Sequence, residues 1–145
     1  MYQSILLCYD GTAEGRRALR HGADVAIAMQ ARAYLLAICR NLLSSAVPEG
    51  VTPELVNCEQ DTASQLLAEG VQWLKDRGVP AEGQLVYGNP MVHIPEVAKR
   101  INADLIVVGH RYRSRMSKWW SEEEEATLLQ KVTCSILVAM DQPVT

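Results

Sequence analysis

The stretch Asp-Leu-Ile-Val-Val-Gly, residues 104–109, is the most strand-like segment of this 145-residue sequence. A short apolar run that ends at a glycine is typical of a strand covered on both faces of a sheet. Just before it, Ile94, Val97, Ala98 and Ile101 recur at the spacing of a helix with one buried face. This part of the chain therefore predicts a helix followed by a buried strand.

The same alternation of strand and helix extends over the whole chain, with no linker, internal repeat or low-complexity segment. Strands are expected at residues 4–9, 33–39, 82–87, 104–109 and 135–139, and helices at 13–29, about 54–77, from about 92–94 onward, and about 121–131. Such alternation implies right-handed crossovers and a parallel sheet with helices on both faces. The sequence predicts a single three-layer α/β domain over residues 1–145.

Three residues are expected to set the ends of helices. Thr12 follows the first strand and is expected to be the N-cap of the first helix. Gly78 is expected to stop the second. Pro95 would remove a hydrogen bond from a helix interior, so the third helix is expected to begin only at about residue 92–94, with Pro95 in its first turn.

Composition excludes several classes of protein. The hydrophobic fraction of 48% and the charged fraction of 21% are those of an ordinary globular domain. A formal net charge of −3 argues against a general nucleic-acid binder. No apolar stretch approaches the roughly 18 residues of a membrane span, and the N-terminus lacks the pattern of a signal peptide. We therefore expect a soluble, cytoplasmic protein.

The cysteine pattern gives no sign of a metal or redox site. Cys8, Cys39, Cys58 and Cys134 form no Cys-x-x-Cys pair and have no histidine at metal-ligand spacing. Three of them lie in strand-like runs, where a free cysteine behaves as a small buried hydrophobe. A cytosolic location also disfavours structural disulfides. Buried thiols and no metal are expected.

Ligands of an open parallel sheet bind beyond the carboxyl ends of the strands, where the strand order reverses. Residues 9–12, 38–41 and 109–121 are expected to converge there.

Segments along the whole chain resemble the universal stress protein family. Residues 5–12 are similar to its opening strand, which ends in Asp-Gly-Ser or Asp-Gly-Thr. Gly88-Asn89-Pro90, with the helix and strand that follow to residue 109, resembles its central signature. Residues 134–139 resemble its closing strand, usually Cys-Pro-Val-Leu-Val-Val. The run from 88 to 109 is the most specific part of the resemblance.

The resemblance implies a fold of the adenine nucleotide alpha hydrolase-like class, with strands ordered 3-2-1-4-5 and a homodimer paired through the last strand. One branch of the family binds ATP through Gly-x2-Gly-x9-Gly followed by Ser or Thr, just after strand four. If a nucleotide is retained here, the resemblance assigns its site to Asp10, Gly11, Thr12, Ile38, Val108, Gly109 and Arg111.

The ATP motif keeps its spacing and loses its chemistry. Gly109 holds the first position, but the second glycine falls at Tyr112 and the closing pair at Glu122 and Glu123. A tyrosine is bulky where the backbone must approach phosphate closely. The glutamates of residues 122–125 would repel a phosphate by about 1 kcal/mol each in bulk water and by more at a partly buried site. The usual triphosphate pose is therefore untenable.

Each of these features also has a purely structural interpretation. Ser121-x-x-Glu124 fits a capping box, and acidic side chains stabilise the first turn of a helix. The basic stretch 110–118 is either an anion site or a partner for those glutamates in exposed salt bridges. Asp10 fits a strand-to-helix turn residue that satisfies backbone N–H groups.

The functional hypotheses follow from these residues. No Ser-His-Asp set, carboxylate pair or metal cluster can be assembled, and His21 and His93 are interpreted as structural, so an enzyme is not expected. The first hypothesis is a non-enzymatic stress-response or signalling protein without a cofactor. The alternative is a small-molecule sensor that holds an adenine nucleotide (ATP or AMP) at the strand ends. A weak nucleotide hydrolase is a third, less favoured hypothesis.

Overall fold

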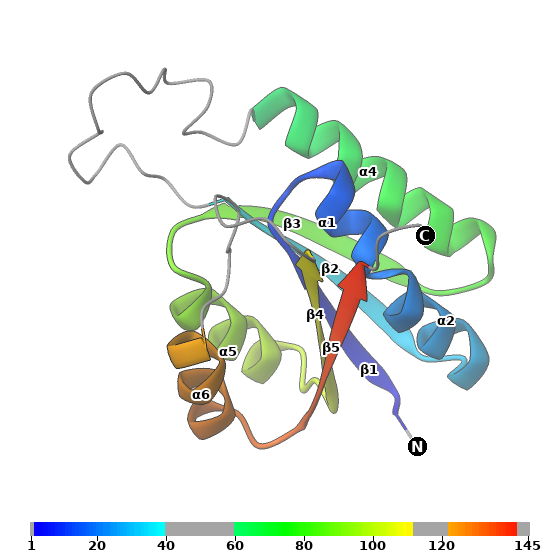
Figure 1. Ribbon diagram of the computed structural model, residues 1–145. Coiled ribbons are helices and arrows are strands. Elements are labelled where there is room, and N and C mark those ends of the chain that lie inside the picture. The colour runs from blue at the N-terminus through cyan, green and yellow to red at the C-terminus, as the bar shows by residue number, and fades with distance from the viewer. Residues whose placement is uncertain (1, 40–59, 112–121, 142–145) are drawn as a thin grey trace, which may run out of the picture.

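The computed structural model describes residues 2–39, 60–111 and 122–141, which form a five-stranded parallel sheet (Figure 1). The strands are β1 (Ser4–Tyr9), β2 (Arg32–Cys39), β3 (Ala81–Tyr87), β4 (Leu105–Arg111) and β5 (Ser135–Asp141). Their order is β3-β2-β1-β4-β5, as the family resemblance implies. β1 therefore lies in the middle of the sheet, parallel to β2 on one side and β4 on the other.

Helices cover both faces of the sheet (Figure 1). One face carries α1 (Ala13–Ala18), α2 (Arg20–Met29) and α4 (Gln60–Asp76), and the other carries α5 (Pro90–Arg100) and α6 (Glu122–Lys131). The predicted three-layer architecture is confirmed for the described residues.

The alternation of side chains along β1 divides the core into two clusters. All six residues of β1 are buried. Leu7 and Tyr9 pack on the α1, α2 and α4 face, and Leu6 and Cys8 pack on the α5 and α6 face. A strand whose two faces are both buried needs the continuous apolar run that the sequence shows.

Two predicted helix ends are confirmed. The Thr12 hydroxyl oxygen accepts a hydrogen bond from the Gly15 N–H at 3.0 Å, which makes Thr12 the N-cap of α1. Gly78 follows α4 with a φ of 82°, the left-handed conformation expected after a helix C-terminus. Residues 54–59 of the predicted second helix lie outside the described residues.

Three details of the predicted elements were wrong. The helix expected at 13–29 is interrupted at Leu19, whose N–H bonds back to Arg16 O at 3.1 Å in a tightened turn. The third helix begins at Pro90, because the Asn89 side chain caps it and proline is well suited to a first helical position. β4 extends to Arg111, two residues beyond the expected end at Gly109.

Among the described residues, no helix combines the length and apolar character needed to cross a bilayer.

Candidate functional site at the strand ends

The candidate site lies at the carboxyl ends of β1, β2 and β4. The order of strands reverses at β1, since β2 and β3 lie on one side of it and β4 and β5 on the other. Cys8 of β1 is opposite Leu36 of β2 and Val108 of β4. Asp10, Ile38 and Gly109 follow these positions closely, so the topology brings them to one edge, as predicted.

The turn from β1 to α1 is built around the Asp10 carboxylate. Its Oδ1 accepts a hydrogen bond from the Thr12 N–H at 3.1 Å and from the Thr12 hydroxyl at 2.6 Å. Gly11, between them, has a φ of 84°. Asp10 therefore holds the residue that caps α1, and the structural interpretation of this aspartate is confirmed.

Gly15 is part of this turn, although the sequence did not point to it. A Cβ built on Gly15 would overlap Asp10 Oδ1 and lie 3.2 Å from the Thr12 hydroxyl oxygen. Only glycine lets the first turn of α1 approach the carboxylate this closely. An isolated glycine inside a helical run was the signal that could have identified it.

The other predicted site residues differ in what they can offer a ligand. Ile38 and Val108 are fully buried in the core cluster on the α5 and α6 face. Arg111 lies in β4, opposite Asp141 of β5. Glu122 and Glu123 begin α6. Tyr112 and Ser121 lie outside the described residues.

The turn from β3 to α5 borders the same edge. The Gly88 N–H donates to Cys39 O at 2.9 Å, and the Asn89 side chain accepts from the Met91 N–H at 2.9 Å. His93 Nε2 lies 3.1 Å from Tyr87 O, so its ring is held by the main chain of this turn. His93 has the structural role that the sequence analysis assigned to it.

Comparison with known proteins decides the family. The model of the universal stress protein family matches residues 1–139. The chain belongs to this family. Universal stress protein YxiE of Bacillus subtilis (strain 168) is 25% identical over 146 aligned residues, which cover 95% of this chain and 99% of that protein.

Solved structures of universal stress proteins share the fold. UspA from Lactobacillus plantarum has a TM-score of 0.70 and 20% identity, covering 95% of this chain and 97% of that one. The universal stress protein from Archaeoglobus fulgidus in complex with dAMP has a TM-score of 0.60 and 18% identity, covering 94% and 97%. These likenesses confirm the predicted fold class.

Two buried groups of β1 in this universal stress protein have perturbed ionisation. Burial raises the pKa of the Tyr9 hydroxyl far above its ordinary value, and the nearby Arg16 guanidinium offsets only part of that rise. The Tyr9 side chain is fully buried, and among the described residues its hydroxyl has no hydrogen-bond partner. Burial likewise raises the pKa of the Cys8 thiol. Both groups are therefore neutral at physiological pH and inert as nucleophiles.

The cysteines of this universal stress protein correct one expectation. Cys8 and Cys134 are free, as predicted, but Cys39 at the end of β2 is disulfide-bonded. The expectation rested on the strand-like surroundings of the cysteines, their spacing and the compartment, and none of these reveals which thiols the folded chain brings within bonding distance. Among the described residues, no group of three or more His, Cys, Asp or Glu side chains could hold a metal ion.

Proposed function

We propose that this universal stress protein is a non-enzymatic, cytoplasmic stress-response or signalling protein that does not bind ATP in the usual mode of its family. The observation that carries the proposal is the start of α6. This helix begins at Glu122 with the sequence Glu-Glu-Glu-Glu. The positive end of a helix dipole favours anions, and in the ATP-binding branch the motif directs phosphates to this turn. Here the chain supplies its own carboxylates.

Electrostatics sets the size of the effect. Each glutamate repels a phosphate by about 1 kcal/mol in water, and by more where solvent is excluded. A triphosphate brings several negative charges, whereas a monophosphate brings fewer and reaches less far along the loop. The repulsion therefore falls most heavily on ATP.

The proposed absence of catalysis is supported by the surroundings of the histidines. His93 is held at Tyr87 O, and His21 is exposed on α2. Tyr9 and Cys8 are buried with raised pKa values, so neither supplies an activated nucleophile.

The proposal includes a homodimer paired through β5. Among the strands that the structure describes, β5 is at one edge of the sheet and pairs with β4 alone. Its central residues Ile136, Leu137 and Val138 are apolar and only partly buried. An apolar edge strand invites pairing with a second chain.

A second candidate is an adenine nucleotide sensor, most simply one for AMP. It is favoured by the convergence of Asp10, Ile38 and Gly109 at the switch point of the sheet. The Archaeoglobus relative with dAMP bears on the same candidate, since a nucleoside monophosphate avoids most of the repulsion from α6.

Calorimetric titration with ATP, ADP and AMP in the presence of magnesium distinguishes the two. The first proposal predicts no ATP binding at micromolar concentration. Binding of AMP alone would establish the sensor, and absence of binding by all three nucleotides would eliminate it. Micromolar ATP affinity would overturn the first proposal.

A further inference from the structure

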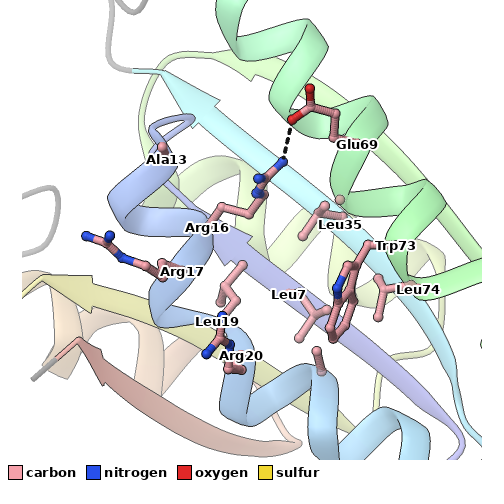
Figure 2. Close-up of a pocket in the computed structure, with 12 residues that line it drawn as sticks. Leu7, Ala13, Arg16, Arg17, Leu19, Arg20, Leu35, Glu69, Trp73 and Leu74 are labelled. Carbon is pink, nitrogen blue, oxygen red and sulfur yellow. Dashed lines mark hydrogen bonds and ion pairs between the residues drawn. The ribbon is translucent and has the colours of Figure 1, made fainter. Parts of the chain in front are cut away.

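A groove of about 410 Å³ lies between α1, the start of α2 and α4, on the face of the sheet that these helices cover (Figure 2). We call it the α1–α4 groove. Its size is within the range of small-molecule sites in proteins, roughly 300–1,000 Å³. Its lining includes none of Asp10, Ile38, Val108 and Gly109, so it is separate from the strand-end site.

The floor of the groove is apolar. Leu7 and Leu35 come from the sheet, and Leu19, Ala23 and Leu74 come from the helices. All five are buried residues of one core cluster. A floor with no polar side chain favours an apolar group in contact with it.

One wall of the groove is the Trp73 indole, which Arg77 holds in place. The Arg77 guanidinium stacks on the indole, 3.7 Å from the ring centroid, and donates a hydrogen bond to Trp73 O at 3.0 Å. Figure 2 shows the indole beside Leu7 and Leu74. A ring fixed in this way contributes apolar contact area to a ligand with little loss of conformational entropy.

The rim is cationic. Arg16, Arg17 and Arg20 line the groove, against the single carboxylate of Glu69. Arg16 is engaged, since it donates to Leu66 O at 2.7 Å and pairs with Glu69 at 3.3 Å (Figure 2). Arg17 points away from Arg16 and Trp73. Within the part of the chain that the structure describes, no hydrogen bond or ion pair involves the Arg20 side chain, so its charge is available to an anion.

We propose that the α1–α4 groove binds a small amphipathic carboxylate. Its apolar body lies beside the partly buried Trp73 indole, above the closed apolar floor, and its carboxylate pairs with Arg20 at the rim. A nucleotide does not fit this description, because the apolar floor gives its polar base and ribose no hydrogen-bond partner. The inference does not depend on the function proposed for the strand ends.

The test uses Trp73 as the reporter and decanoate as the probe. The chain has three tryptophans, so the Trp119→Phe and Trp120→Phe double variant leaves Trp73 alone. Decanoate is expected to change its emission saturably at sub-millimolar concentration, and 1-decanol, which has the same chain without the charge, is expected to bind more weakly.

Two variants and a control locate the site. Arg20→Gln is expected to weaken decanoate binding by about tenfold, the size of one charge-assisted contact. Ala23→Met fills the groove and is expected to abolish binding while circular dichroism shows an intact fold. Arg32→Gln removes another exposed arginine, one outside the groove, and is expected to leave affinity unchanged.

The proposal is overturned if decanoate gives no saturable change at millimolar concentration. It is equally overturned if Arg20→Gln and Arg32→Gln bind with the same affinity, or if the folded Ala23→Met variant still binds as the parent does.

Discussion

The ammonium nitrogen of Lys131, at the end of α6, lies 3.3 Å from the carbonyl oxygen of Met91, in the first turn of α5. In a regular helix that carbonyl would accept from the N–H of residue 95. Residue 95 is proline and has no N–H. Lys131 therefore replaces the missing donor and joins the two helices that cover this face of the sheet.

Lys131→Met is expected to lower the free energy of unfolding by about 0.5–1 kcal/mol, the value of a partly exposed hydrogen bond. In a Pro95→Ala background the restored N–H supplies Met91 O, so the same substitution is expected to cost less. Urea unfolding of the parent, the two single variants and the double variant measures the coupling between Lys131 and Pro95. Equal costs in both backgrounds would show that Lys131 does not replace the proline N–H. Lys99→Met, on α5 itself, serves as the control and should cost the same in both.

Tyr9→Phe is expected to leave stability unchanged at neutral pH or to raise it by about 1 kcal/mol, because it removes a buried hydroxyl for which the described part of the chain supplies no hydrogen-bond partner. A loss above about 1 kcal/mol would reveal a hydrogen bond that the structure does not contain. Tyr87→Phe, at a side chain that is 40% exposed, is the matched control.

Stability is also expected to fall in alkaline solution because of Tyr9. Its pKa is higher in the folded protein than the ordinary value of 10.0. Above pH 10.0 the unfolded chain therefore binds fewer protons than the folded one, and the free energy of unfolding decreases as pH rises. Below that pH both states keep the proton and the effect vanishes. Thermal unfolding measured against pH should show a smaller alkaline loss of stability in Tyr9→Phe than in the parent. The loss that remains is expected to come from Cys8, whose pKa is raised in the same direction.

Gly15→Ala is expected to destabilise the protein by about 1–3 kcal/mol, although alanine is normally the better helix residue. The cause is the overlap of the new Cβ with Asp10 Oδ1. In an Asp10→Ala background that oxygen is absent, so the same change should become neutral or stabilising. Chemical denaturation measures both increments. A similar cost with and without Asp10 would mean that the carboxylate is not the obstacle.

Val138→Lys is expected to convert the proposed dimer to a monomer. Val138 is partly buried on the edge strand β5, and a lysine on an edge strand opposes pairing with another strand. Sedimentation equilibrium of the parent and the variant measures the change. An unchanged mass would place the interface elsewhere or show that the parent is a monomer.

The strands could be predicted to within one or two residues because strands buried on both faces, such as β1 and β4, must be apolar throughout. The strand order came from the resemblance to the family. The interruption at Leu19 and the early start of α5 were missed, since both depend on local hydrogen bonds that helical periodicity does not encode. Contacts between distant parts of the sequence are also invisible to periodicity: the Asp104 carboxylate accepts from the N–H groups of Gln3 at 2.8 Å and Ser4 at 3.1 Å, about 100 residues away.

Some features of the candidate sites could likewise be predicted from the sequence, and others could not. Asp10 could be placed at the edge of the sheet because it directly follows β1, whereas Gly109 was expected to end a strand that continues to Arg111. The α1–α4 groove could not be predicted, because Leu7, Arg20 and Trp73 come together only when the helices pack on the sheet.

The proposed absence of the usual ATP mode is tested most directly by calorimetric titration of ATP into the parent and into the variant Tyr112→Gly, Glu122→Gly and Glu123→Ser. This variant rebuilds the family's motif from Gly109 onward. We predict no measurable ATP binding by the parent and a gain of at least about tenfold in the variant, equivalent to removing about 1.4 kcal/mol of repulsion. Micromolar ATP binding by the parent, unchanged in the variant, would contradict the proposal.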